Sequence, residues 1–139
     1  MDLAKYFLVP IFTFVLGLLS GLLPFVKKPL TDYRQTLIDI SQLMLGSAPI
    51  IFRGDIAEAE KFYDHVRKLH ARLMSSADSI PRPTRPILQV LGLLRPRDQV
   101  ELGGKALIGI SNQVITAHRD NSHLAKLIEQ LGTALDITV

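Results

Sequence analysis

The chain contains no cysteine among its 139 residues. This absence excludes disulfide bonds, thiolate zinc sites and thiol nucleophiles, although a domain without disulfides can lie on either side of a membrane. A large excess of basic residues is absent as well, because the net charge is only +3. Nucleic-acid binders usually cluster their basic residues more densely, so we expect no nucleic-acid partner.

Charge is also missing from one long stretch near the N-terminus. Residues 6–26, YFLVPIFTFVLGLLSGLLPFV, are 21 residues without a charged side chain. As a helix, with a rise of about 1.5 Å per residue, they would extend for roughly 31 Å and cross the ~30 Å hydrocarbon core of a bilayer. The sequence therefore predicts a transmembrane helix at 6–26, preceded by an N-terminal arm at 1–5.

A cleavable secretory signal is the alternative interpretation of this stretch, because a short basic start precedes an apolar segment. The uncharged run is about twice as long as the apolar core of a typical signal. Moreover, Ser20 and Gly21 are followed by large apolar residues and not by a small-x-small cleavage site. We therefore interpret 6–26 as an anchor that stays attached.

The charges on either side of the run predict its orientation. Lys5 precedes the run, whereas Lys27, Lys28 and Arg34 follow it. The flank richer in Lys and Arg usually faces the cytoplasm, although the free α-amino group reduces the difference here. We expect a single-pass membrane protein whose C-terminal domain is cytoplasmic.

Small residues recur along one face of the predicted anchor. Thr13, Gly17 and Gly21 are spaced four residues apart, and such a row allows two membrane helices to approach closely. The row is therefore a candidate homodimer face. Glycine is also common in membrane helices for other reasons, so the spacing alone does not decide between the two interpretations.

After an exit segment at 27–30, the pattern predicts a helical domain over 31–139. Thr31 is placed to cap a helix that begins near Asp32 and ends near Gly46 or Pro49. Its apolar face consists of Tyr33, Leu37, Ile40 and Met44. Ile50, Ile51 and Phe52 come next and are too few to assign: they fit a helical turn, a packed loop or an insertion among lipid head groups.

The middle of the domain carries the clearest helical pattern. An unbroken apolar stripe predicts a helix over 55–77, with Asp55 as its cap. A connector follows at 79–98, where prolines alternate with Arg82, Arg85, Arg95 and Arg97. Within it, 87–94 is strongly apolar on most sides, which predicts either a short helix buried in the core or one lying in the membrane interface.

Two further helices complete the predicted domain. Asp98 and Glu101 have the spacing of a capping box and open a helix that runs to about His118. Gly103, Gly104 and Gly109 each cost this helix about 1 kcal/mol relative to alanine, and we expect them to permit close packing. The last helix should begin after Asn121 or Ser122 and end near Leu135, with a frayed tail over 136–139.

Together these patterns predict an all-α protein: an N-terminal single transmembrane helix followed by a small antiparallel bundle of about four to five helices. No motif indicates catalysis. His65 and His70 lie about 140° apart around their helix, so they do not share a face as metal ligands would. His118 and His123 flank a turn, where solvated or helix-capping histidines are far commoner than ligands. We expect no catalytic residue, no metal and no cofactor.

Three functions fit these features. The first is a non-enzymatic module that binds a protein partner, itself included, at the inner membrane face. The candidate contacts with lipid or partner are Lys27, Lys28, Arg82, Arg85, Arg95 and Arg97. The second is direct binding of anionic lipid through short apolar segments and their flanking arginines. The third is a small-molecule or catalytic site between the helices.

Overall fold

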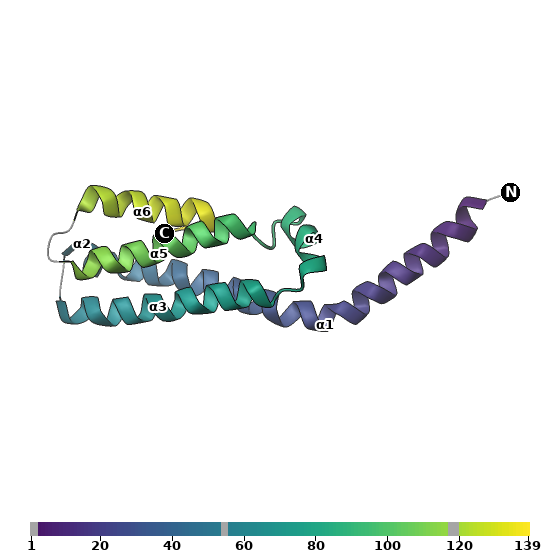
Figure 1. Cartoon of the computed structure of the whole chain (residues 1–139), viewed down its shortest axis with the longest axis horizontal. Coiled ribbons are helices and arrows are strands. Elements are labelled where there is room, and N and C mark those ends of the chain that lie inside the picture. Colours follow the sequence, from purple (N-terminus) through teal and green to yellow (C-terminus); the bar gives the residue numbers. More distant parts are fainter. Residues whose placement is uncertain (1–2, 54–55, 117–119) are drawn as a thin grey trace.

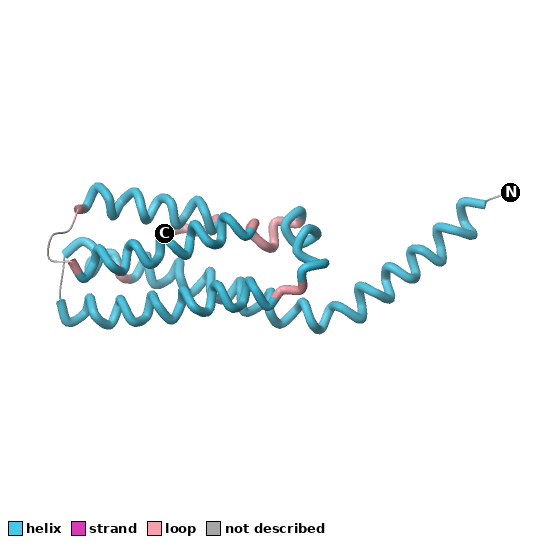
Figure 2. Tube along the Cα trace, in the orientation of Figure 1, coloured by secondary structure: helices cyan, strands magenta, loops and turns pink. Residues whose placement is uncertain are grey.

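The computed structural model describes residues 3–53, 56–116 and 120–139. Every regular element within these ranges is helical, which confirms the predicted all-α class (Figures 1 and 2). The elements are α1 (Leu3–Gly46), α2 (Ala48–Arg53), α3 (Ile56–Ser79), η1 (Arg82–Thr84), α4 (Arg85–Val90), α5 (Arg97–Ile115) and α6 (Asn121–Leu135).

Four long helical segments form the bundle. The C-terminal half of α1 packs on α3, α3 packs on α5, and α5 packs on α6 (Figure 1). Because successive long helices run in opposite directions, the predicted antiparallel bundle is confirmed. The predicted apolar stripe of α3 faces the core, since Phe62, Val66, Leu69 and Leu73 are buried. Burial of each such side chain contributes about 1.5–3 kcal/mol relative to exposure.

Helix α1 corrects the predicted break between an anchor and a second helix. The helix continues through Pro24 and Pro29 to Gly46, and the Thr31 hydroxyl, 2.8 Å from the Lys27 carbonyl oxygen, donates a hydrogen bond within it. Thr31 is therefore not an N-cap. Interior prolines remove backbone hydrogen bonds and bend a helix without always ending it. Figure 1 shows α1 changing direction where it leaves the bundle.

The N-terminal half of α1 projects away from the bundle (Figures 1 and 2). Among the residues that the structure describes, no helix is both long enough and apolar enough to cross a bilayer. The structure thus shows the helix predicted at 6–26 but does not support the membrane span itself. Part of this stretch, at positions 6–9, 11, 12, 15, 18, 19 and 22, has side chains outside the described set.

The glycines of α5 lie at helix interfaces, as predicted. A Cβ atom on Gly103 would lie 2.5 Å from Leu135 Cγ, and one on Gly104 would lie 3.2 Å from the His70 ring. On Gly109 it would lie 3.1 Å from a methyl group of Leu127. These distances show that α3 and α6 approach the α5 backbone closely, so glycine relieves crowding that alanine would create.

Two further predicted caps are wrong, and a fourth lies outside the described residues. Helix α5 begins at Arg97 after Pro96, so Asp98 is in its first turn and is not its cap. Helix α6 is capped by Asp120, whose carboxylate accepts hydrogen bonds from the backbone N–H groups of Ser122 and His123 at 2.9 and 3.1 Å. The cap predicted at Asp55 lies outside the described residues.

The C-terminal tail is packed, which corrects the predicted fraying. Asp136 adopts a left-handed conformation and turns the chain at the end of α6. Ile137 and Val139 then pack against the hydrophobic core, and the Ser41 hydroxyl of α1 donates a hydrogen bond to the Thr138 carbonyl oxygen. The tail therefore links the last helix to the first.

Candidate functional site

The end of the bundle from which α1 projects collects most of the predicted contact residues. A groove of about 760 Å³ lies there between α1 and α3. Most of its lining residues have polar side chains, and they come from residues 28–36 and 71–79: Lys28, Pro29, Asp32, Thr36, Ala71, Arg72, Ser75, Ser76 and Ser79. The exit of α1 therefore lies beside the C-terminal end of α3.

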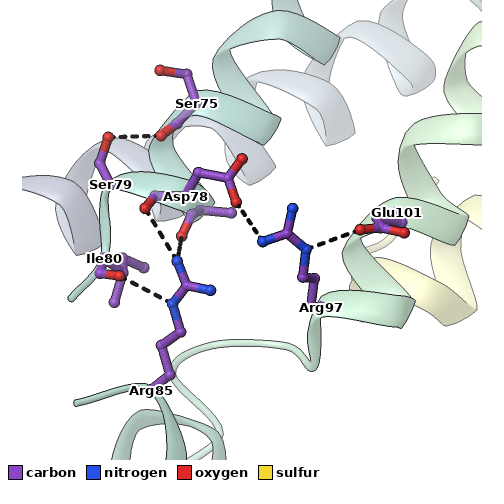
Figure 3. A network of polar contacts seen from close by, with 8 residues as sticks. Ser75, Asp78, Ser79, Ile80, Arg85, Arg97 and Glu101 are labelled. Atoms are coloured by element: carbon purple, nitrogen blue, oxygen red, sulfur yellow. Dashed lines mark hydrogen bonds and ion pairs between the residues drawn. The ribbon is translucent and has the colours of Figure 1, made fainter. Parts of the chain in front are cut away.

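Arg85 holds the start of α4 on this end of the bundle. Its Nε donates to the Ile80 carbonyl oxygen at 3.0 Å, and its Nη2 donates to the carbonyl oxygens of Ala77 and Asp78 at 3.3 and 3.1 Å (Figure 3). The last carbonyl groups of a helix have no partner within the helix and carry partial negative charge. Arg85 thus caps the C-terminus of α3.

Arg97 connects α3 with the start of α5. Its guanidinium lies 3.1 Å from an Asp78 carboxylate oxygen and 2.9 Å from one of Glu101 (Figure 3). The hydrogen bond that Arg97 donates to Glu101, followed by the charge of Asp78, raises the pKa of Arg97 above its ordinary value. The side chains of Arg97 and Asp78 are both exposed, so their ion pair contributes little free energy.

Arg95 performs a similar capping role on α6. It donates hydrogen bonds to the carbonyl oxygens of Ala134 and Thr133 at 3.1 and 3.2 Å. The nearby Tyr33 is buried, and its hydroxyl forms no hydrogen bond within the structure described. Burial raises the pKa of Tyr33, although the backbone of Arg95, and after it the charge of that residue, act in the opposite direction.

The side chains of the other three predicted basic contacts form no hydrogen bond or ion pair of this kind with the described residues. Lys27, Lys28 and Arg82 are exposed, and no ion pair or side-chain hydrogen bond joins them to another described residue. Residues 27–34 and 78–98 hold seven basic and three acidic residues, a net charge of +4 against +3 for the whole chain. The positive excess is therefore concentrated at this end.

Helix α4 presents an apolar surface to the outside. Ile87, Val90 and Leu91 are 54%, 89% and 63% exposed, whereas Leu88 and Leu94 are buried on the opposite side. The prediction of a fully buried helix at 87–94 is therefore wrong for this outward face. Helix α2 contains Ile50, Ile51 and Phe52. Of these, Ile51 is buried and Phe52 is exposed.

The candidate dimer row lies on the projecting half of α1. A Cβ atom on Gly17 or Gly21 would have no other heavy atom within 4 Å, and Thr13 is exposed on the same face. The row is therefore accessible to a second helix. Whether two chains associate there stays a prediction.

The described residues contain no cluster of three or more histidine, cysteine, aspartate or glutamate side chains that could hold a metal ion. His118 lies outside these residues, so the predicted approach of His118 to His123 is not tested. His70 is half-buried against α5, and this burial, together with the charge of Arg67, lowers its pKa. It packs in the interface between α3 and α5.

Sequence reasoning missed that three arginines of the connector are used inside the fold. The alternation of proline and arginine is the sequence signal for this role, since a stiff connector must be held on the helix ends that it joins. Comparison with protein-family models, curated proteins and solved structures finds no match to this chain. The geometry of the protein itself is therefore the basis for its proposed function.

Proposed function

We propose that this chain is a single-pass membrane protein whose bundle is a non-enzymatic protein-interaction module at the inner membrane face. The projecting half of α1 carries the proposal. Every side chain described between Pro10 and Phe25 is exposed, including Phe14 at 69% and Phe25 at 71%. Soluble monomers rarely leave so continuous an apolar surface in water, whereas a bilayer would cover it.

The complete sequence of 6–26 supports the same proposal, because its 21 residues include those whose side chains lie outside the described set, and none is charged. Lys27 and Lys28 follow directly and are exposed, as expected of residues at the head-group level. Their excess over Lys5 favours a position of the bundle on the cytoplasmic side.

A binding role is favoured by the polar groove beside the exit of α1. Its walls carry both charges, and the exposed Arg72 pairs with Asp39 across α1 and α3 at 3.0 Å. A partner's polar segment would find donors and acceptors there close to the bilayer. A second copy of this chain could bring its own groove to the same level through the row of Thr13, Gly17 and Gly21.

Extraction of membranes that contain the full chain tests the anchor. We expect the protein to stay with the membranes at alkaline pH and to enter solution only with detergent. Recovery of the intact chain in the soluble fraction without detergent would refute the membrane proposal. A tag on each terminus, probed with protease before and after permeabilisation, tests the predicted side.

Photo-crosslinking from the groove tests the interaction role. A crosslinking amino acid at Ser75, an exposed residue of the groove, should give a discrete protein adduct in intact membranes. The matched control is Lys61, which is exposed on the same helix outside the groove. Identical adduct patterns at the two positions would count against a specific partner in the groove.

A further inference from the structure

The outward face of α4 needs an explanation because the rest of the helix is firmly placed. Ile87, Val90 and Leu91 follow helical spacing of three and four residues, so they form one surface. Leu88 and Leu94 anchor the other side in the core. Arg85 ties the first turn to α3 by three hydrogen bonds. The apolar face is thus held outward by the fold.

The turn after α4 fixes the same orientation. The backbone N–H groups of Leu93 and Leu94 both donate to the Leu88 carbonyl oxygen, at 2.8 and 3.2 Å. Gly92 has a φ of +68°, a conformation that glycine adopts without strain. This closed turn returns Leu94 to the core and leaves Leu91 outside. The exposed face therefore does not arise from a loose end of the chain.

The position of α4 identifies what covers this face. Arg85 contacts the end of α3, and Ser79 of that end lines the same groove as Lys28 of α1. Figure 1 likewise shows α4 at the end of the bundle from which α1 projects. The apolar face thus lies close to the level at which the uncharged run ends and the basic residues begin. In a membrane-inserted chain this is the level of the lipid head groups.

We propose that Ile87, Val90 and Leu91 insert into the head-group region of an anionic bilayer and give the bundle a second membrane contact. This inference rests on the anchor proposed above. Amphipathic segments bind at this boundary through an apolar face with basic residues at its edges. Here Lys27, Lys28 and Arg82, which pair with no other residue that the structure describes, would face lipid phosphates, and the local charge of +4 would favour anionic lipids.

The absence of tryptophan from the chain permits a direct test. Full-length protein with Val90→Trp is reconstituted into vesicles that contain phosphatidylglycerol and lipids brominated near the head group. We expect loss of most of the tryptophan fluorescence. The matched control is His123→Trp, an exposed position at the start of α6, which should keep its fluorescence.

A second measurement guards against insertion driven by the indole ring itself. The chain also lacks cysteine, so Val90→Cys and His123→Cys each provide a single thiol. In the same vesicles a bulky maleimide should label Val90→Cys much more slowly than His123→Cys, and detergent should remove the difference. Equal labelling in vesicles would overturn the proposal even if Val90→Trp is quenched.

The outcomes separate this inference from the anchor on which it rests. If neither tryptophan variant floats with the vesicles, the anchor has failed. If both float but Val90→Trp keeps its fluorescence, the anchor stands and the α4 contact is wrong. Vesicles in which phosphatidylcholine replaces phosphatidylglycerol, with the brominated lipids kept, should quench Val90→Trp less, and equal quenching would overturn the role assigned to anionic lipid.

Discussion

The two halves of α1 have the same secondary structure and opposite surroundings. Between Tyr33 and Gly46, apolar residues recur on one side, and Tyr33, Ile40 and Met44 are buried against the bundle. Before Val26, apolar residues occur all round the helix and those described are exposed. A one-sided pattern needs a partner helix, whereas an all-round pattern needs an apolar environment on every side. The two halves of this one continuous helix therefore require different surroundings.

The largest expected effect comes from placing charge in the projecting half. Leu16→Arg with Leu23→Arg should remove the chain from membranes, because each arginine costs about 2.5–3.5 kcal/mol at the centre of a membrane helix. Flotation with vesicles measures the loss. Ile38→Arg with Leu45→Arg, at exposed positions of the packed half, is the matched control and should still float. Loss of flotation in both variants would show that the two halves do not differ in this way.

Truncation of an apolar side chain of α1 should destabilise the bundle only when it lies in the packed half. Ile40→Ala should lower the free energy of unfolding by about 2–5 kcal/mol, since it leaves a cavity at a fully buried position. Leu23→Ala, in the projecting half, should leave the unfolding of the bundle unchanged. Denaturant titration in mild detergent, followed by circular dichroism, measures both. An equal loss of stability would mean that the projecting half packs on the bundle after all.

Glycine substitutions sharpen the comparison at the level of single atoms. Gly103→Ala should destabilise the bundle by about 1–3 kcal/mol, because the new methyl group overlaps Leu135. Gly17→Ala meets nothing within 4 Å and should not change the unfolding transition. Thermal unfolding of the two variants measures the difference. A stabilised Gly103→Ala would indicate that helix propensity outweighs packing at that interface.

The smallest expected effect is the pH dependence from His70. Its pKa is lowered from 6.5 by burial in the fold, so the unfolded chain binds the proton more readily. The stabilisation should be complete above pH 6.5 and should be lost as the pH falls through the lowered pKa. His70→Gln should reduce the change in the free energy of unfolding with pH, which denaturant titrations at several pH values measure. His65→Gln, at an exposed position of the same helix, should leave it unchanged.

Most of the bundle could be predicted from periodicity. The stripe of α3 is buried as expected, because helix geometry alone places residues three and four apart on one side. Helix limits were less predictable. Pro24 and Pro29 stop many helices, yet here α1 continues, and the side chains of Tyr33 and Ile40 fix its direction only through contacts with other helices.

The residue types of the candidate site could be predicted from the sequence, but the contacts that these residues make could not. The connector arginines stand out in the sequence, but a guanidinium serves equally well for a phosphate, a carboxylate or a helix end. Whether Arg85 and Arg95 bind a phosphate, a carboxylate or a helix end depends on where α3 and α6 end in the folded bundle. The outward face of α4 was hidden for the same reason, since an apolar run does not say which of its sides finds a partner.

By itself the sequence determined the helical class, the limits of the uncharged run and the stripes that make the core, because these depend on local spacing and side-chain chemistry. Only the tertiary structure decided which connector arginines bind helix ends, why glycine is needed at Gly103, and that α4 lies at the end of the bundle from which α1 projects. Those features depend on contacts between residues far apart in the chain. Such contacts form only when the whole bundle has packed.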